Sequence, residues 1–277
     1  MALVTMTEML RDARKEHRAV GAFNVANYET SLAVLKAAEG ERSPVIIQVY
    51  DRLFQSDKAA DIAGTLIRLA RRANQPIALH LDHGSSLEHV ALALHAGYTS
   101  VMFDGSRLPY QENAAKTKLA AELAHAAGCS VEGEIGHVAQ GDETSLTSVE
   151  EAVDFAHATK VDALAVSIGT THGVYISAPH LNIDLLRQIN AVSPVPLVLH
   201  GGSGTPADQL KDAIANGIAK INIYSELTAA WNTAMRDFLN AREQMTCWFA
   251  VACKQPNEAM KDAMRNKFLM FNADAKA

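Results

Sequence analysis

The chain has 277 residues, of which 48% are hydrophobic and 20% are charged, so it can bury one large core or two smaller ones. Its formal net charge is −6, and its basic residues form no cluster beyond Arg71 and Arg72, which argues against nucleic acid and anionic membranes as partners. Three cysteines without C-x-x-C spacing argue against a disulfide framework and against a structural zinc knot.

The N-terminal segment becomes charged within about ten residues and carries no apolar stretch typical of a signal peptide. No apolar run approaches the roughly 18 residues of a membrane span. We therefore expect a cytoplasmic protein.

Short apolar runs rich in β-branched residues alternate with stretches whose apolar residues recur at spacings of three and four. The runs predict strands at 20–25, 45–49, 77–81, 100–103, 130–135, 163–168, 197–199 and 220–223. The intervening stretches predict helices at 30–38, 60–73, 86–96, 112–127, 149–158, 182–189 and 207–216. Glycines stand where three of these helices should stop, at Gly97, Gly128 and Gly217.

Eight strand–helix alternations over about 230 residues predict an α/β fold of the (β/α)8 TIM-barrel type rather than an open doubly wound sheet. No linker divides the chain, so we expect a single domain over 1–277, with the barrel at about 18–240 and a C-terminal helical segment at about 241–277. Four aromatic residues of the C-terminal part are expected to pack its helices, namely Trp231, Trp248, Phe249 and Phe268.

In a TIM barrel the active site lies at the C-terminal ends of the strands. The predicted strands are almost wholly apolar, whereas polar residues fall at or just after their ends, namely Asn24, Asp82, His83, Asp104, Glu134, His172, His200 and Asn222. The alternative is that polar residues simply begin loops, and for Asn24 or Asp104 alone this alternative is at least as good.

Three histidines, His83, His172 and His200, each follow such a run and precede glycine. Neutral imidazole suits Zn²⁺, and three protein ligands with one open position are typical of catalytic zinc. Each histidine could instead end a strand and bond locally, but three at equivalent strand ends favour a metal. Asp82, beside His83, suits a general acid or base; alternatively it orients an imidazole.

The stretch HGGSGTP at 200–206 and the stretch NIYSE at 222–226 follow the last two predicted strands. Loops at these positions commonly hold phosphate in TIM barrels, because glycines expose backbone N–H groups and a helix N-terminus adds its dipole. The only lysine in the runs is Lys220, which starts the eighth and so belongs to the face that serves stability. A Schiff base is therefore disfavoured, and a metal acting as a Lewis acid would be the electron sink.

Several segments together resemble the class II, zinc-dependent ketose-bisphosphate aldolases, which include fructose- and tagatose-bisphosphate aldolases. They are HLDHGSS at 80–86, TSVMFDGSRLP at 99–109, SVEGEIG at 130–136, DALAVSIGTTHGVY at 162–175, PLVLHGGSG at 196–204 and GIAKINIYSEL at 217–227. The resemblance implies reversible cleavage of a ketose 1-phosphate or 1,6-bisphosphate into dihydroxyacetone phosphate and an aldehyde. It also implies Zn²⁺ as cofactor, a monovalent cation as a candidate activator, and a homodimer or homotetramer.

The resemblance also assigns roles. Asp82 would shuttle the proton at the C4 hydroxyl of the sugar. The metal would be bound by His83, His172 and His200, with Asp104 and Glu134 beside it. Candidate substrate and phosphate contacts are Asn24, Gly173, Gly201, Gly202, Ser203, Asn222 and Ser225.

Two loops depart from the family pattern. After the fifth strand, Ala139 and Gln140 replace paired glycines, and counting from Glu134 puts Asp142 at the place of the loop acid, with Glu143 next to it. Either residue could be the acid, and the alternative is an inert solvated loop.

After the second strand the chain has Tyr50, Asp51 and Arg52 where the family commonly has a serine and small residues. Arg52 could pair with an anion, whereas Asp51 would oppose one, so the aldehyde end need not carry phosphate. One alternative is therefore a class II aldolase that releases an unphosphorylated or acidic aldehyde. Two further alternatives are a zinc hydrolase and a non-catalytic sugar-phosphate-binding barrel.

Overall fold

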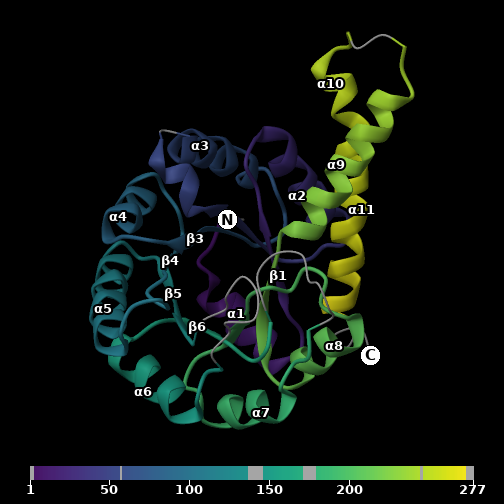
Figure 1. Ribbon diagram of the computed structural model, residues 1–277. Helices are drawn as coiled ribbons and strands as arrows, with labels where there is room; N and C mark the ends of the chain where they lie inside the picture. The colour runs from purple at the N-terminus through teal and green to yellow at the C-terminus, as the bar shows by residue number, and fades with distance from the viewer. Residues whose placement is uncertain (1–2, 57, 137–145, 171–178, 244–245, 273–277) are drawn as a thin grey trace.

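A computed structural model describes residues 3–56, 58–136, 146–170, 179–243 and 246–272 of the chain. Eight parallel strands form a closed barrel in sequence order, and β8 pairs with β1 (Figure 1). The strands are β1 (Val20–Asn24), β2 (Val45–Tyr50), β3 (Ile77–Gly84), β4 (Ser100–Phe103), β5 (Ser130–Ile135), β6 (Ala163–Val166), β7 (Leu197–Leu199) and β8 (Ile218–Ile223). The predicted TIM barrel is confirmed.

Seven helices surround the barrel, as the predicted alternation requires (Figure 1). They are α2 (Tyr28–Gly40), α3 (Lys58–Ala70), α4 (Leu87–His95), α5 (Tyr110–Ala126), α6 (Val149–Thr159), α7 (Ile183–Val192) and α8 (Ala207–Ala215). Side chains fix several of their starts: Asn27 and Ser148 each form a capping box at the beginning of α2 and α6. A short 3₁₀ helix, η1 (Asp51–Gln55), follows β2 directly.

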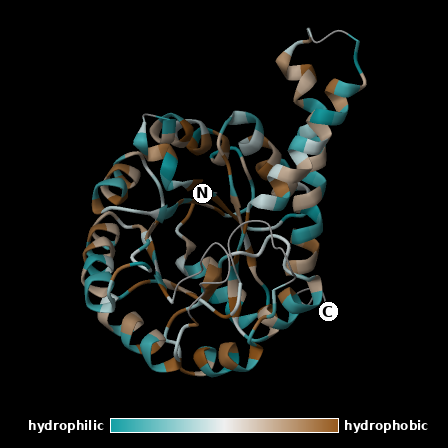
Figure 2. Ribbon diagram, viewed as in Figure 1, coloured by the Kyte–Doolittle hydropathy of each residue, from teal (hydrophilic) through white to brown (hydrophobic). Residues whose placement is uncertain are grey.

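Two apolar cores stabilise this arrangement. The outer core lies between strands and helices, and Figure 2 shows hydrophobic residues along the strands and interspersed with hydrophilic ones on the surrounding helices. The inner core fills the floor of the barrel, where Met6 and Leu10 of helix α1 (Met6–Lys15) pack with Val20, Ile46 and Ala163. The sequence patterns did not predict α1, which closes the N-terminal end of the barrel.

The C-terminal helices form an arm. Helices α9 (Ser225–Asn240) and α11 (Lys254–Phe271) lie side by side, and their far end projects beyond the barrel with α10 (Phe249–Ala252) at the tip (Figure 1). Trp231 and Phe268 pack the C-terminal helices as predicted. Trp231 Nε1 on α9 donates a hydrogen bond to Asn257 Oδ1 on α11, and the Phe268 ring on α11 lies 5.1 Å from that of Phe23 on β1.

The same expectation is wrong for the two aromatic residues at the tip of the arm. Trp248 and Phe249 are 83% and 88% exposed, because the tip extends past the barrel surface that could cover them. Among the described helices, none combines the length and the apolar character that a bilayer span needs.

The interior of the barrel contains polar as well as apolar side chains. Gln48, His80, Glu132 and Lys220 are fully buried within strands, because every second strand residue points inward. Lys220, expected on the face that serves stability, is the third residue of β8, and its Nζ lies 2.8 Å from Glu132 Oε2 in the barrel interior.

Candidate active site

Polar side chains from several strands converge at the C-terminal mouth of the barrel. Four of them lie at the ends of strands β1, β5, β7 and β8, namely Asn24, Glu134, His200 and Asn222. Strand β3 contributes the adjacent pair Asp82 and His83. Successive strand residues normally point to opposite faces. Here His83 has a φ of 53°, and the pairing of β3 with β4 shifts register between Leu81 and Gly84, so the chain leaves strand geometry at this pair.

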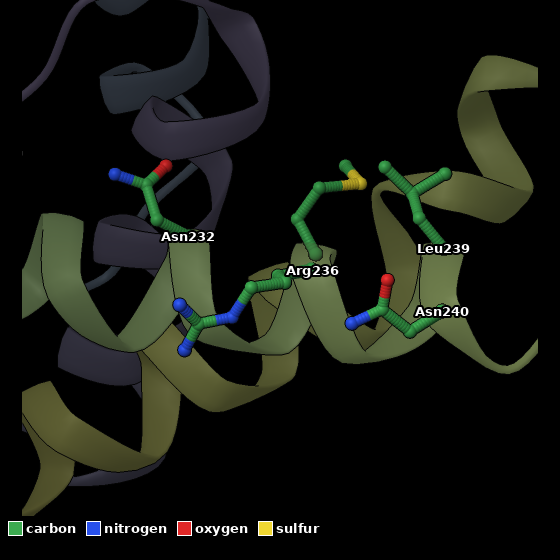
Figure 3. A pocket seen from close by; sticks show the side chains of 5 residues that line it. Asn232, Arg236, Leu239 and Asn240 are labelled. Atoms are coloured by element: carbon green, nitrogen blue, oxygen red, sulfur yellow. The ribbon is translucent and has the colours of Figure 1, made fainter.

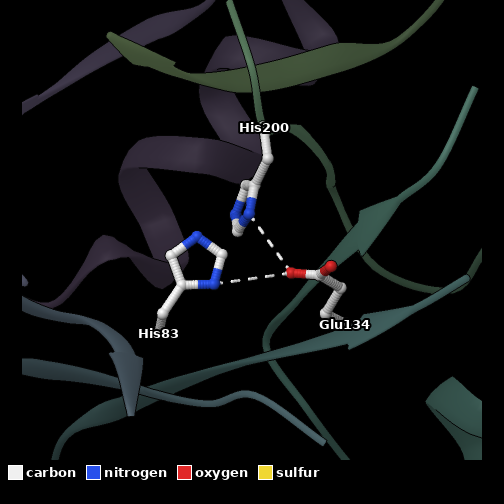
Figure 4. A group of neighbouring side chains, drawn as sticks. All are labelled: His83, Glu134 and His200. Atoms are coloured by element: carbon white, nitrogen blue, oxygen red, sulfur yellow. Dashed lines mark ion pairs between the residues drawn. The ribbon is translucent and has the colours of Figure 1, made fainter. Parts of the chain in front are cut away.

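His83, Glu134 and His200 form a group whose potential ligand atoms all lie within 4.8 Å of one another (Figure 4). Glu134 Oε2 is 3.2 Å from His200 Nδ1 and 3.8 Å from His83 Nδ1. This oxygen is buried and accepts no hydrogen bond from the described residues, so it retains a lone pair for a cation. Two imidazoles and one carboxylate are a donor set that zinc commonly takes, and the residues present therefore fit the implied metal.

Carboxylates surround the two imidazoles of this group. His83 Nδ1 lies 2.7 Å from Asp104 Oδ2. Burial lowers the pKa of His83, but Asp82, Asp104 and Glu134 outweigh burial and raise it to about 10. Burial likewise lowers the pKa of His200, and the neighbouring glutamates raise it above its ordinary value. Without a metal the site thus holds protons between its carboxylates, and a divalent cation would replace them.

Asp82 lies beside this group and is held by two amides. Its Oδ2 accepts a hydrogen bond from Asn24 Nδ2 at 2.6 Å, and its Oδ1 accepts one from Asn222 Nδ2 at 3.2 Å. Burial raises the pKa of Asp82, but the charges of His83, His200 and Lys220 and the Asn24 hydrogen bond bring it below its ordinary value. Asp82 is therefore an ionised, immobilised carboxylate, suited to accept a proton from a bound substrate.

The loop after β7 meets the N-terminus of α9. Gly202 N donates to Asn222 O at 3.1 Å, and Ser203 Oγ accepts from Tyr224 N at 2.9 Å, immediately before Ser225 begins the helix. A Cβ at Gly202 would lie 2.5 Å from Ile221 Cγ2, so only glycine allows this close approach. The arrangement combines a glycine-containing loop with a helix N-terminus, as anion sites do.

Comparison with known proteins identifies the family. A profile described as Fructose-bisphosphate aldolase class-II matches residues 4–276. The chain belongs to the class II fructose-bisphosphate aldolase family. It is 39% identical over 287 residues to the sulfofructosephosphate aldolase of Alkalicoccus urumqiensis, with 100% of this chain and 99% of the relative covered. It is 38% identical over 288 residues to the 6-phospho-5-dehydro-2-deoxy-D-gluconate aldolase of Bacillus subtilis (strain 168), with 100% and 98% covered.

Solved structures agree with this assignment. The crystal structure of the YdjI aldolase from Escherichia coli K12 superposes with a TM-score of 0.89 at 35% identity, and 99% of each chain is covered. The resemblance drawn from the sequence is confirmed. This class II aldolase is an enzyme of the aldehyde-lyase type, from a family that acts on small sugar phosphates. The hydrolase and non-catalytic alternatives are set aside.

Of the other predicted site residues, Gly201 and Arg52 are described by the structure and four are not. Gly201 directly follows His200 with a φ of 69°, and Thr205 Oγ1 donates to its carbonyl at 3.1 Å. Arg52 is exposed on η1, and within the described ranges no hydrogen bond or ion pair joins it to the mouth of the barrel. Four predicted residues lie outside the described residues and stay predictions, namely His172, Gly173, Asp142 and Glu143.

Sequence analysis missed a second polar group, beneath the mouth of the barrel. Glu132, His80 and Lys220 lie below the metal group, and Glu132 Oε1 is 2.8 Å from His200 Nε2. One signal could have found them: each stands two residues before a predicted site residue on the same strand, and strand residues two apart face the same side.

A separate hollow of about 370 Å³ lies on the arm rather than at the barrel mouth (Figure 3). Its lining comes from one helix, α9, through Asn232, Met235, Arg236, Leu239 and Asn240. None of these residues contributes to the metal group or to the loops that follow β7 and β8, so the hollow is not the candidate active site.

Proposed function

We propose that this class II aldolase uses Zn²⁺ to cleave, reversibly, a ketose 1-phosphate or 1,6-bisphosphate into dihydroxyacetone phosphate and an aldehyde. The observation that carries the proposal is the position of Asp82, whose buried carboxylate is held by two amides next to a group of candidate metal ligands. Such a carboxylate can move a proton on a substrate oxygen while a neighbouring cation stabilises charge on the carbonyl side.

The residues of the site divide the work of the reaction. A divalent ion held by His83, His200 and Glu134, with His172 as a further predicted ligand, would supply a Lewis acid that polarises the ketose carbonyl. In the cleavage direction Asp82 takes the proton from the C4 hydroxyl oxygen as the C3–C4 bond breaks. In condensation Asp82 returns that proton to the aldehyde oxygen.

The remaining predicted contacts hold the phosphorylated half. We assign the phosphate to the loop containing Gly201, Gly202 and Ser203 and to the start of α9 at Ser225, where backbone N–H groups and the helix dipole favour an anion. Asp142 or Glu143 is assigned the proton that C3 gains after cleavage.

The product of condensation tests this proposal. Metal-replete protein is incubated with dihydroxyacetone phosphate and a panel of aldehydes with and without a terminal phosphate, and products are identified by mass spectrometry. We expect a ketose 1-phosphate to form and its formation to stop after exhaustive chelation and to return with Zn²⁺. Full activity in the chelated protein, or no product with any aldehyde, would contradict the proposal.

A second candidate, release of an unphosphorylated aldehyde, is favoured by the residues near Tyr50. The Tyr50 ring lies 6.1 Å from that of His83. Burial raises the pKa of the Tyr50 hydroxyl, and Asp82, Asp51 and Asp104 raise it further, against Arg107. These three carboxylates, offset in part by the imidazoles of His83 and His89 and by Arg107, disfavour a terminal phosphate next to Tyr50.

The relatives support a distinction of this kind, because their names specify different phosphorylated sugar derivatives. The aldehyde panel separates the two candidates. Preference for a phosphorylated aldehyde such as glyceraldehyde 3-phosphate would support a bisphosphate substrate and reject the second candidate. Preference for neutral aldehydes would support it.

We also propose that the enzyme is a homodimer or homotetramer that pairs through the arm. The exposed side chains of Trp248 and Phe249 at its tip support a second copy as the partner, since exposed apolar patches often mark interfaces. Light scattering after gel filtration should give a multiple of the 29.8 kDa chain mass, and the double variant W248S/F249S should lower it. A wild-type monomer at micromolar concentration would reject the assembly.

A further inference from the structure

The layer directly beneath the metal group differs from the ordinary filling of a TIM barrel. Such barrels are usually filled with bulky branched apolar side chains, as the floor of this one is. Above the floor, Glu132, His80 and Lys220 are fully buried and inside the strands. Burying charges costs free energy unless they are paired, and apolar side chains of similar volume often stabilise a protein equally well or better. Stability alone therefore does not account for this layer.

Glu132 is at the centre of this layer, and each of its oxygens has a different partner. Oε1 lies 2.8 Å from His200 Nε2, and Oε2 lies 2.8 Å from Lys220 Nζ. His80 Nε2 is 3.8 Å from the same Oε2, while His80 Nδ1 lies 2.7 Å from Ser100 Oγ. One carboxylate thus joins a predicted metal ligand just after β7 to a lysine on β8.

The geometry defines which nitrogen of His200 can bind a metal. An ionised carboxylate only accepts hydrogen bonds, so in the neutral ring that would bind a metal the proton stands on Nε2. The lone pair of Nδ1 then faces Glu134 Oε2, 3.2 Å away, on the side where His83 also lies (Figure 4). A carboxylate that holds the second nitrogen of a ligating imidazole typically fixes its tautomer and its orientation.

We propose that Glu132 and Lys220 are positioning residues for the metal centre. Glu132 holds His200 in the tautomer and rotation that present Nδ1 to the metal, and Lys220 supplies the countercharge that keeps the carboxylate of Glu132 in place. The inference rests on the proposed metal-dependent function. It goes beyond that function because it assigns part of the site's affinity for its metal to two residues outside the group of candidate ligands.

Zinc affinity tests the inference through the double variant E132M/K220M. This variant removes both buried charges and the oxygen that accepts from His200 Nε2, and it nearly preserves volume. It also avoids the unpaired Lys220 that E132M alone would leave. Competition with a chromophoric chelator should show zinc binding about 10- to 100-fold weaker than in wild type. Co²⁺ substituted into the site should show altered visible absorption bands, because the ligand field changes when His200 is free to rotate.

Ser100→Ala is the matched control. It removes a buried hydrogen bond in the same layer, from His80, but Ser100 makes no contact with His200 among the described interactions. Its thermal unfolding temperature should fall, while its zinc affinity and Co²⁺ spectrum should match wild type. Comparison with this control separates positioning of a ligand from general loss of stability.

Kinetics at saturating Zn²⁺ add a second readout. We expect kcat of E132M/K220M to be about tenfold lower, with KM for the ketose phosphate changed less than twofold, because the phosphate contacts are intact. If wild-type protein binds zinc and the double variant binds it equally well, the inference is overturned and the proposed function stands. If wild-type protein binds no zinc, both are overturned.

Discussion

The floor and the mouth of the barrel are built on the same strands but from opposite kinds of side chain. On β1, Val20 belongs to the apolar floor and Asn24 to the polar mouth; on β3, Ala78 and Asp82 divide in the same way. The floor needs only volume and apolar surface, because helix α1 seals it from water. In the mouth, polar side chains hold one another, as Asn24 and Asn222 hold Asp82. The comparison indicates that a substitution in the floor should change stability, and one in the mouth should change chemistry.

The largest effect is expected at Asp82. Asp82→Ala removes the proposed base and should lower kcat by about 10²- to 10⁴-fold, the usual contribution of general acid–base catalysis. Zinc content, measured by atomic emission, should stay at the wild-type level, because Asp82 is not among the grouped ligands. A variant that turns over at the wild-type rate would remove Asp82 from the mechanism and would break the distinction between mouth and floor.

The floor should show the opposite behaviour. Ile46 is fully buried against α1, so Ile46→Ala leaves a cavity and should lower the free energy of unfolding by about 2–5 kcal/mol. Urea denaturation followed by circular dichroism measures this loss. The kcat of the folded variant should equal that of wild type; a tenfold lower kcat would mean that floor packing reaches the chemistry.

The sequence predicted the strands within a few residues, since the alternation of apolar runs and amphipathic helices is a local pattern. It also predicted the positions of Asp82, His83 and His200 at strand ends. It did not predict α1 or the exposure of Trp248, because both depend on where distant parts of the barrel lie.

The pair formed by Glu132 and Lys220 shows the same limit for the site. These residues are 88 positions apart, and only the closed barrel brings their side chains together. The local pattern does hold a clue, because Glu132 precedes Glu134 by two residues and must face the same interior. Two residues that meet across the barrel interior, and that no sequence motif links, are therefore the part that sequence reasoning overlooked.

A smaller effect should appear as acid sensitivity of the polar layer. Burial lowers the pKa of His80, with Lys220 lowering it and Glu132 raising it, to about 3. Below pH 6.5 the unfolded chain protonates this histidine while the folded chain does not, so stability falls as pH falls from about 6.5 toward 3. The slope from this one group reaches at most about 1.4 kcal/mol per pH unit.

The window between pH 6.5 and about 4.5 isolates this histidine in metal-free protein. The raised pKa values of His83 and His200 change stability above that window, and the lowered pKa of Asp82 acts below it. Urea midpoints measured across the window should fall for wild type and stay nearly constant for His80→Gln. Parallel curves for the two proteins would show that His80 is not held neutral.

The smallest effect concerns the phosphate loop, where the mouth depends on backbone rather than on charge. Gly202→Ala places a Cβ 2.5 Å from Ile221 Cγ2 and 2.9 Å from Asn222 O, so the loop must move away from β8. We expect KM for the ketose phosphate to rise about tenfold, equivalent to about 1.4 kcal/mol of binding, with a smaller change in kcat. Gly64→Ala on α3, where a Cβ meets nothing within 4 Å, is the control and should leave KM unchanged. If the KM of Gly202→Ala also equals that of wild type, the phosphate is bound elsewhere. Gly202 then serves only to pack the loop after β7 against β8.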